Sequence, residues 1–226
     1  MDAQGPELNA PGETGVQGGC VTIEITLEEH AMPVVGKRFR DALVWAAELH
    51  EDQKRKGGNI PYVSHLIGVA SIVLEHGGDE DQAIGALLHD ALEDQKHKMG
   101  PNEIRARFGE TVEAIVEACT DGEPEEQRDR DPGRWKVRKQ KYIADIATKP
   151  EAALLVSMAD KLYNARAILE DFREMGDKLW PRFTAGKDGT LWYYRSLLTA
   201  FRPRADNRLW HELDRTVAEI ERLAKA

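Results

Sequence analysis

The sequence predicts an all-α protein, and two observations support this class. From Gly36 onward, apolar residues recur at the three- and four-residue spacing of amphipathic helices. Strand patterns are scarce: residues 21–25 alternate like a β-strand, but no second strand is predicted to pair with them. Nothing is repeated along the chain, which argues against a repeat architecture. With 226 residues, 41% of them hydrophobic, the chain can bury one sizeable core.

The first half of the chain contains four predicted helices. An apolar stripe from Phe39 to His50 predicts the first, and residues 63–75 predict the second, which a His-Gly-Gly sequence ends. Residues 81–93 predict the third. Pro101 starts the fourth, because proline is tolerated in the first turn of a helix, and Gly109 is expected to break it.

The second half contains a polar loop followed by further helices. Residues 121–133 are acidic and show no helical period, so a loop is predicted there. A long helix is expected at residues 151–171, of which residues 152–159 are strongly apolar. Shorter helices are predicted at residues 135–147, 190–201 and 209–224, with a turn at residues 180–183.

The charge balance limits the classes of partner. The net charge of −9 argues against binding to nucleic acid or to an anionic membrane, although a local basic pocket for a polyphosphate is compatible with it. No apolar run reaches membrane-spanning length, and no signal-peptide pattern is visible. Cys20 and Cys119 form neither a CxxC pair nor a disulfide framework, so we expect a cytoplasmic location.

The most informative motif lies in residues 86–94. His89 and Asp90 are followed by Glu93 and Asp94, and alanines and leucines make up the rest. On one helix the four polar side chains span an arc of about 140°, at about 100° per residue. Burying them is costly unless a metal ion or hydrogen bonds satisfy them. The adjacent His and Asp can bind one divalent cation, and a carboxylate one turn later can reach its water. The alternative is an ordinary charged surface helix.

Two further residues are candidates for the rest of a metal site. His65 follows a proline at a helix start, where a lone histidine is more often structural. Asp160 ends the apolar run of residues 153–159, so it needs a buried partner, either a metal ion or a basic side chain. Asn164 lies one turn later on the same face. Two imidazoles and two carboxylates suit Mn, Fe, Co or Zn.

These segments, in this order, resemble the HD-domain phosphohydrolases. More narrowly, they are similar to the hydrolase domain of stringent-response enzymes and to the small stand-alone alarmone hydrolases. The resemblance covers roughly residues 36–170 and rests on several ordered segments, which are far more specific than a His-Asp pair alone. They are residues 50–57 and 61–65, residues 87–94, the pairs Phe108-Gly109 and Thr120-Asp121, and residues 158–166 (Met-Ala-Asp-Lys-Leu-Tyr-Asn-Ala-Arg).

The resemblance implies an HD-domain helical bundle with additional C-terminal helices. Residues 34–175 would form the hydrolase domain, and residues 176–226 a helical extension packed on the same domain. Residues 1–33, rich in Gly, Pro, Glu and Thr, are expected to be a flexible N-terminal tail.

The resemblance also implies a role for each candidate residue. One divalent metal ion, typically manganese in this family, would be held by His65, His89, Asp90 and Asp160. Glu93 and Asp94 would orient or deprotonate the attacking water. The nucleotide substrate would contact Arg55, Lys56, Tyr163, Asn164, Arg138 and Lys139.

The implied reaction is removal of the 3′-pyrophosphate from guanosine tetra- or pentaphosphate (ppGpp or pppGpp), which leaves GDP or GTP. One alternative is an HD-type hydrolase for a nucleoside monophosphate or for the 2′-phosphate of NADPH. Another is a non-catalytic nucleotide sensor, although all four ligand positions and the acidic pair are present.

Three structural questions stay open at the level of sequence. Residues 121–131 are interpreted as a solvated loop, or alternatively as a lid whose Arg128, Arg130 and Arg134 reach a phosphate. The aromatic run of residues 192–194 is expected in the core or an interface rather than against a ligand. The C-terminal helices also allow a homodimer.

Overall fold

The regular secondary structure is helical throughout the described residues, which are 35–56, 58–120 and 131–225 of the computed structural model. The all-α class is therefore confirmed. The described residues belong to one compact unit that spans Met32–Ala226. The predicted N-terminal tail, the strand-like residues 21–25 and most of the acidic segment at 121–131 lie outside the described residues.

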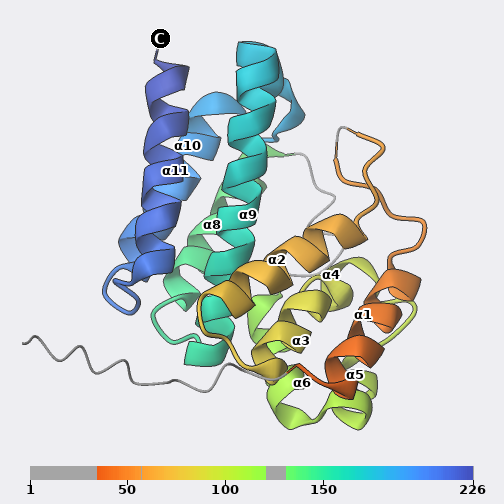
Figure 1. Ribbon diagram of the computed structural model, residues 1–226. Coiled ribbons are helices and arrows are strands. Elements are labelled where there is room, and N and C mark those ends of the chain that lie inside the picture. The colour runs from red at the N-terminus through yellow and green to blue at the C-terminus, as the bar shows by residue number, and fades with distance from the viewer. Residues whose placement is uncertain (1–34, 57, 121–130, 226) are drawn as a thin grey trace, which may run out of the picture. The chain divides into compact units, whose positions relative to one another are not determined.

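Figure 1 shows the helices in their order along the chain. Before the acidic segment they are α1 (Lys37–Leu49), α2 (Val63–Glu75), α3 (Glu80–Leu88), α4 (Ala91–Asp94), α5 (Pro101–Phe108) and α6 (Glu110–Cys119). After it they are α8 (Pro132–Asp145), α9 (Glu151–Met175), the 3-10 helix η1 (Gly176–Arg182), α10 (Gly186–Phe201) and α11 (Arg208–Ala224).

Helix α3 lies at the centre of the first half of the fold. It packs against α1, α2, α6 and α9, and its apolar residues from Ala83 to Leu88 are fully buried. A helix that is apolar on every side is stable only when neighbours cover it all round. The first turn is fixed by Asp79, whose side chain accepts a hydrogen bond from the backbone N–H of Gln82. Packing of α3 therefore fixes the position of His89, which follows it directly.

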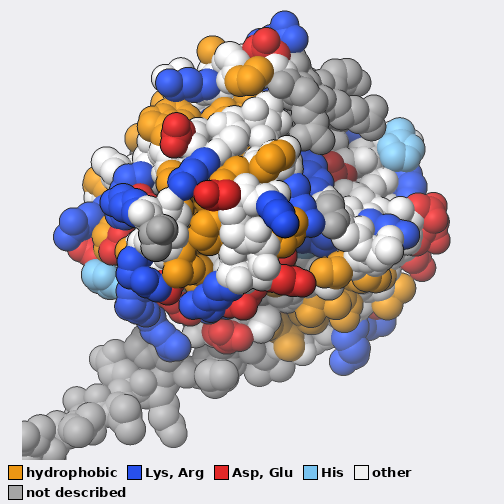
Figure 2. All heavy atoms as spheres, turned by 90° about the horizontal axis from the view of Figure 1, so that it is seen from above, with side chains coloured by type: hydrophobic (Ala, Val, Ile, Leu, Met, Phe, Trp, Pro, Cys, Tyr) orange, Lys and Arg blue, Asp and Glu red, His pale blue; other side chains and the backbone are white. Residues whose placement is uncertain are grey.

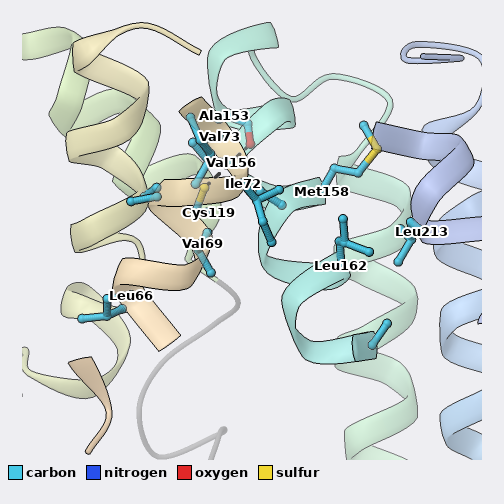
Figure 3. Packing of buried hydrophobic residues seen from close by; sticks show 14 of the residues in the cluster. Leu66, Val69, Ile72, Val73, Cys119, Ala153, Val156, Met158, Leu162 and Leu213 are labelled. Atoms are coloured by element: carbon cyan, nitrogen blue, oxygen red, sulfur yellow. Dashed lines mark hydrogen bonds between the residues drawn. The ribbon is translucent and has the colours of Figure 1, made fainter. Parts of the chain in front are cut away.

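Helix α9 connects the two halves of the fold. Over its 25 residues it packs against α2, α3 and α6, and also against η1 and α11 (Figure 1). Figure 3 shows its two sides: Ala153 and Val156 lie near Val73 of α2, whereas Leu162 points toward Leu213 of α11. Asp160 lies between these two contacts, so its position depends on both.

The expected helix of residues 81–93 is interrupted, which corrects the sequence prediction. Helix α3 ends at Leu88, and the short α4 begins at Ala91. The imidazole of His89 explains the break, because its Nδ1 lies 2.8 Å from the carbonyl oxygen of Ala86, which an unbroken helix would use for a backbone bond. The expected break at Gly109 is confirmed, since this residue has a φ of 93° between α5 and α6.

Two helices begin earlier in the chain than the sequence predicts. Helix α8 begins at Pro132 rather than at residue 135, because Asp131 accepts a hydrogen bond of 2.8 Å from the backbone N–H of Arg134 and caps it. Helix α10 begins at Gly186 rather than at residue 190. The predicted turn at residues 180–183 falls largely within η1.

The C-terminal helices pack on the rest of the described fold through α9 and α8. The apolar stripe of α11, which includes Leu213 and Val217, is buried. Arg204, between α10 and α11, donates hydrogen bonds to the carbonyl oxygens of Ile146 (3.1 Å) and Lys149 (2.5 Å) and so ties this region to the end of α8.

The surface carries both signs of charge. On the face shown in Figure 2, Lys and Arg side chains lie among acidic and hydrophobic ones. Each helix in the part of the chain that the structure describes is too short or too polar to cross a bilayer.

Candidate metal centre and substrate pocket

Four side chains converge from three parts of the fold. His65 is in the first turn of α2, His89 and Asp90 link α3 to α4, and Asp160 is in α9. His65 Nε2 lies 3.5 Å from Asp90 Oδ2 and 3.3 Å from Asp160 Oδ1. His89 Nε2 lies 3.1 Å and 3.6 Å from the same two oxygens. The fold thus brings together the four predicted ligands.

The donor set fits a single divalent cation. Two donors bound at about 2.1 Å to one ion lie about 3.0–3.4 Å apart in octahedral or tetrahedral geometry, close to the separations found here. The candidate ligand atoms of His65, His89 and Asp160 all lie within 4.8 Å of one another. His89 Nε2 is buried without a hydrogen bond, while its Nδ1 donates to the carbonyl of Ala86. With Nδ1 engaged by this carbonyl, Nε2 is the nitrogen that faces the carboxylates and that can bind a metal ion once its proton has left.

Neighbouring side chains hold the two candidate carboxylate ligands. The Tyr62 hydroxyl donates a 2.5 Å hydrogen bond to Asp90 Oδ2. Asn164 Nδ2 donates to Asp160 Oδ1 at 2.5 Å, and Lys161 Nζ donates to Asp160 Oδ2 at 2.6 Å. The sequence offered a metal ion or a basic side chain as the partner of Asp160. The structure places a basic side chain against one oxygen of this carboxylate and the two histidines against the other.

The charges of this cluster are strongly coupled. Burial works to lower the pKa of His89, but the carboxylates of Asp90 and Asp160 outweigh it and hold this pKa well above its ordinary value. Burial works to raise the pKa of Asp160, but Lys161 and the two histidines outweigh it and hold this pKa well below the ordinary range. Without a cation, the proton on His89 therefore compensates the carboxylates, and a cation bound there would displace it.

The raised pKa of His89 predicts how stability depends on pH in metal-free protein. The stabilisation is fully present below the unfolded pKa of about 6.5 and is lost as pH rises through the folded pKa. We expect the melting temperature in EDTA to fall as the pH rises through the folded pKa. The increase in melting temperature that added Mn²⁺ produces should grow with pH. Thermal denaturation from pH 6 to 9 measures both trends. In His89→Gln the dependence should flatten, and a melting temperature that rises with pH in EDTA would contradict the prediction.

The acidic pair lies beside this cluster. Glu93 and Asp94, both in α4, line the same pocket as the four candidate ligands. Burial, with a smaller contribution from the charge of Asp90, raises the pKa of Asp94. Asp94 Oδ2 accepts a 2.6 Å hydrogen bond from Nε2 of Gln53. Sequence reasoning did not single out Gln53, although it lies two residues before Arg55 in a motif that was noted.

The cluster opens into a pocket with a volume of about 420 Å³. Five of the predicted substrate-binding residues line it: Arg55, Lys56, Arg138, Lys139 and Asn164. Arg55 Nη2 donates to Asn164 Oδ1 at 3.0 Å, so a residue between α1 and α2 contacts one on α9. Lys161 also lines the pocket and adds a half-buried positive charge that the sequence assignment omitted.

Tyr163 has a different place from the other predicted substrate contacts, because it is absent from the described pocket lining. Its ring packs edge-on against His65 with centroids 4.9 Å apart, and the Arg55 guanidinium lies 5.4 Å from its centroid. The structure therefore places Tyr163 between a candidate ligand and a candidate nucleotide contact, where it supports both side chains.

Helices α8 and α10 form much of the far wall of the pocket. Trp135 and Tyr142 come from α8, and Tyr193 and Tyr194 come from α10. Tyr193 and Tyr194 were expected in the core, and both are indeed buried, yet they also line the pocket. The C-terminal region therefore contributes to the pocket, which the sequence left open.

Gly68 makes the placement of Tyr163 possible. A Cβ added at Gly68 would lie 2.0 Å from Cε2 of Tyr163, so Gly68→Ala must displace that ring. We expect a loss of about 1–3 kcal/mol in the free energy of unfolding, together with an increased KM, since Arg55 rests on the same ring. Gly85→Ala is the matched control: its Cβ would meet Ile115 at 2.5 Å in the core between α3 and α6. Comparable destabilisation in both variants with the same KM would contradict the assigned role.

Comparison with known proteins identifies the family. The family model described as HD domain matches residues 42–191 of this chain. The chain belongs to the HD domain family. The match reaches beyond α9 into the start of α10, so it includes much of the pocket wall. The four candidate ligands and the acidic pair of this HD domain all lie inside the matched range.

Curated relatives show which proteins this chain is similar to within the family. Guanosine-3′,5′-bis(diphosphate) 3′-pyrophosphohydrolase MESH1 of Xenopus tropicalis is 37% identical over 129 residues, covering 56% of this chain. The human protein of that name is 34% identical over the same length. The HD-domain chain spans 66% of the length of each of these two relatives, slightly under two thirds.

Two solved structures share the fold. One, described as a metazoan ortholog of SpoT that hydrolyzes ppGpp, is 26% identical with a TM-score of 0.66, covering 83% of this chain and 97% of the other. The structure of lmo0812 from Listeria monocytogenes is 27% identical with a TM-score of 0.60, covering 72% of this chain and 99% of the other.

Proposed function

We propose that this protein is a metal-dependent phosphohydrolase that removes the 3′-pyrophosphate from guanosine tetra- or pentaphosphate. The observation that carries the proposal is the convergence of two imidazoles, two carboxylates and the acidic pair at one end of a pocket lined by basic side chains. The names of the frog, human and metazoan relatives support the choice of substrate.

Each part of the pocket has a task in this reaction. A divalent cation, for which we propose Mn²⁺, held by His65, His89, Asp90 and Asp160, would act as a Lewis acid on a phosphoryl oxygen and acidify the attacking water. Asp94, whose pKa burial raises, suits a general base better than a carboxylate with an ordinary pKa would, and Glu93 beside it would orient the water.

Basic side chains of the pocket would contact the substrate and the departing groups. Water adds to phosphorus, its proton passes to the base, and the bond between this phosphorus and the 3′-oxygen breaks as that oxygen takes up a proton. The products are GDP or GTP, with a free 3′-hydroxyl, and pyrophosphate. Arg138, Lys139 and Lys161 line the pocket and would neutralise charge on the departing groups. Arg55 and Asn164, joined by a hydrogen bond, together with Lys56, would contact the nucleoside.

The proposal has consequences for the whole chain. Residues 34–175 would act as the hydrolase domain, and residues 176–226 would complete its pocket through Tyr193 and Tyr194. We place the protein in the cytoplasm, where it would lower the alarmone level of the stringent response. A homodimer through the C-terminal helices stays a prediction.

Product analysis tests the proposal. The full chain loaded with Mn²⁺ is incubated with guanosine 3′,5′-bis(diphosphate), with nucleoside mono- and triphosphates, and with NADPH. Release of GDP and pyrophosphate from the alarmone alone is the expected result. Turnover of only another compound would replace the proposed substrate, and bound metal without any turnover would favour a nucleotide sensor.

A further inference from the structure

We propose that Gln53 is a positioning residue that fixes one carboxylate oxygen of Asp94 through an uncharged hydrogen-bond network. The proposal rests on the proposed function, because it assigns Asp94 to the attacking water. Gln53 lies outside the helices, between α1 and α2, and its side chain is half-buried at the edge of the pocket.

The network has a definite polarity. Gln53 Nε2 donates to Asp94 Oδ2 at 2.6 Å. On its other side, Gln53 Oε1 lies 2.7 Å from Gln95 Nε2 and 2.7 Å from His50 Nδ1. An ionised carboxylate only accepts hydrogen bonds, so the amide must present its nitrogen to Asp94 and its oxygen to the other two groups. His50 must therefore carry its proton on Nδ1.

The surroundings hold this arrangement in place. His50 and Gln95 are both buried. The backbone N–H of Gln53 donates to the carbonyl of His50 at 3.0 Å, and the backbone N–H of Tyr62 donates to the carbonyl of Gln53 at 2.9 Å. The His50 ring stacks on Tyr62 with centroids 5.2 Å apart. Since Tyr62 also donates to Asp90, one assembly holds both Asp94 and a candidate metal ligand.

A neutral donor suits a carboxylate that must accept a proton. A Lys or Arg at this distance would stabilise the ionised form and make Asp94 a weaker base. The amide orients the carboxylate without adding a charge. With Oδ2 engaged by Gln53, Oδ1 is the oxygen left to meet water in the pocket.

Kinetics of two variants separate positioning from packing. Gln53→Met keeps the length of the side chain but removes the donor, and Gln53→Glu keeps its shape but places a carboxylate against Asp94. We expect kcat to fall by about 10–100-fold in both, because misplacement of a catalytic group by about 1 Å has effects of this size. KM and Mn²⁺ content should stay within about twofold of the wild type. Gln140→Leu, at an exposed glutamine of α8, is the control.

The outcomes are distinct. A Gln53→Glu enzyme with wild-type kcat would show that only the shape matters and would overturn the proposal, as would loss of Mn²⁺ with unchanged kcat at saturating metal. Failure of the wild type to hydrolyse the alarmone would instead refute the proposed function. In that case the kinetic comparison moves to whichever nucleotide of the panel is turned over.

The histidine tautomer gives a readout that needs neither metal nor turnover. In ¹⁵N-histidine spectra of the metal-free full chain near pH 7, His50 should carry its proton on Nδ1, with Nε2 bare. Burial lowers the pKa of His50, which keeps the ring neutral there. The Gln53→Met variant should lose this tautomer preference. A wild-type His50 with its proton on Nε2 would contradict the polarity of the network and with it the proposal.

Discussion

Replacing Asp160 with asparagine should remove metal binding and hydrolysis together. The carboxylate has one oxygen facing both histidines and the other paired with Lys161, so asparagine loses the charge that a cation needs and removes the ion pair of the half-buried Lys161. Removing one partner of a buried charge pair costs about 3–5 kcal/mol in the free energy of unfolding. Since loss of an outer-shell partner alone lowers metal affinity by about 10–100-fold, loss of a ligand should lower Mn²⁺ affinity by at least about 100-fold. Metal content after dialysis and alarmone hydrolysis measure the two losses.

Two further variants keep this test interpretable. Asp160→Asn also removes the ion pair with Lys161, which costs stability, so His89→Gln, which leaves the Asp160–Lys161 pair intact, is measured beside it. Glu170→Gln changes an exposed carboxylate on the same helix and should keep full metal content. Unchanged metal content in both Asp160→Asn and His89→Gln would exclude the four-ligand centre.

The helices were predictable because each amphipathic segment carries its own period. The break at Gly109 followed from a local preference for positive φ, and the structure has it there. The break after Leu88 was missed, because it depends on an imidazole that competes for the carbonyl of Ala86 in a buried setting. Periodicity describes which face is apolar, and it contains no information on such side-chain competition.

The candidate site likewise has a part that the sequence predicted and a part that only the tertiary structure shows. His89, Asp90, Glu93 and Asp94 could be grouped from their spacing alone. His65 and Asp160 were added as candidates from their local sequence context, and the family resemblance then assigned all four ligands to one metal ion. Their convergence depends on how α2 and α9 pack against α3, which no local pattern specifies. The contacts of Gln53 with Asp94 and of Lys161 with Asp160 differ again: the motifs contained both residues, but only the tertiary structure shows which carboxylate each one meets.

The far wall of the pocket was the least predictable part. Tyr193 and Tyr194 have the hydrophobic spacing of core residues, and they are buried as that spacing predicts. They line the pocket as well because α10 packs beside α8 and η1. When a residue packs in the core and also lines a pocket, the sequence shows only the hydrophobic spacing of a core residue.

Replacing Glu93 with glutamine and Asp94 with asparagine should separate catalysis from metal binding. Both side chains line the pocket beside the candidate ligands, and the proposal assigns the metal ion to His65, His89, Asp90 and Asp160 instead. The double variant should therefore keep its Mn²⁺ and its affinity for the alarmone while kcat falls by about 10²–10⁴-fold, the usual contribution of general acid–base catalysis. Single-turnover hydrolysis, metal content and equilibrium binding of the alarmone measure the three quantities.

The pH profile assigns the base within this pair. A base acts when it is deprotonated, so kcat/KM should rise with pH through the pKa of Asp94, which burial places above the ordinary carboxyl value. The Asp94→Asn variant should lose this acidic limb, whereas Glu93→Gln should keep it at a lower rate. The control changes the exposed residues Glu51 and Asp52 to Gln and Asn, which leaves the described pocket lining intact. If Asp94→Asn kept the limb and Glu93→Gln abolished it, Glu93 would be the base, and Gln53 would then support a carboxylate that only orients the water.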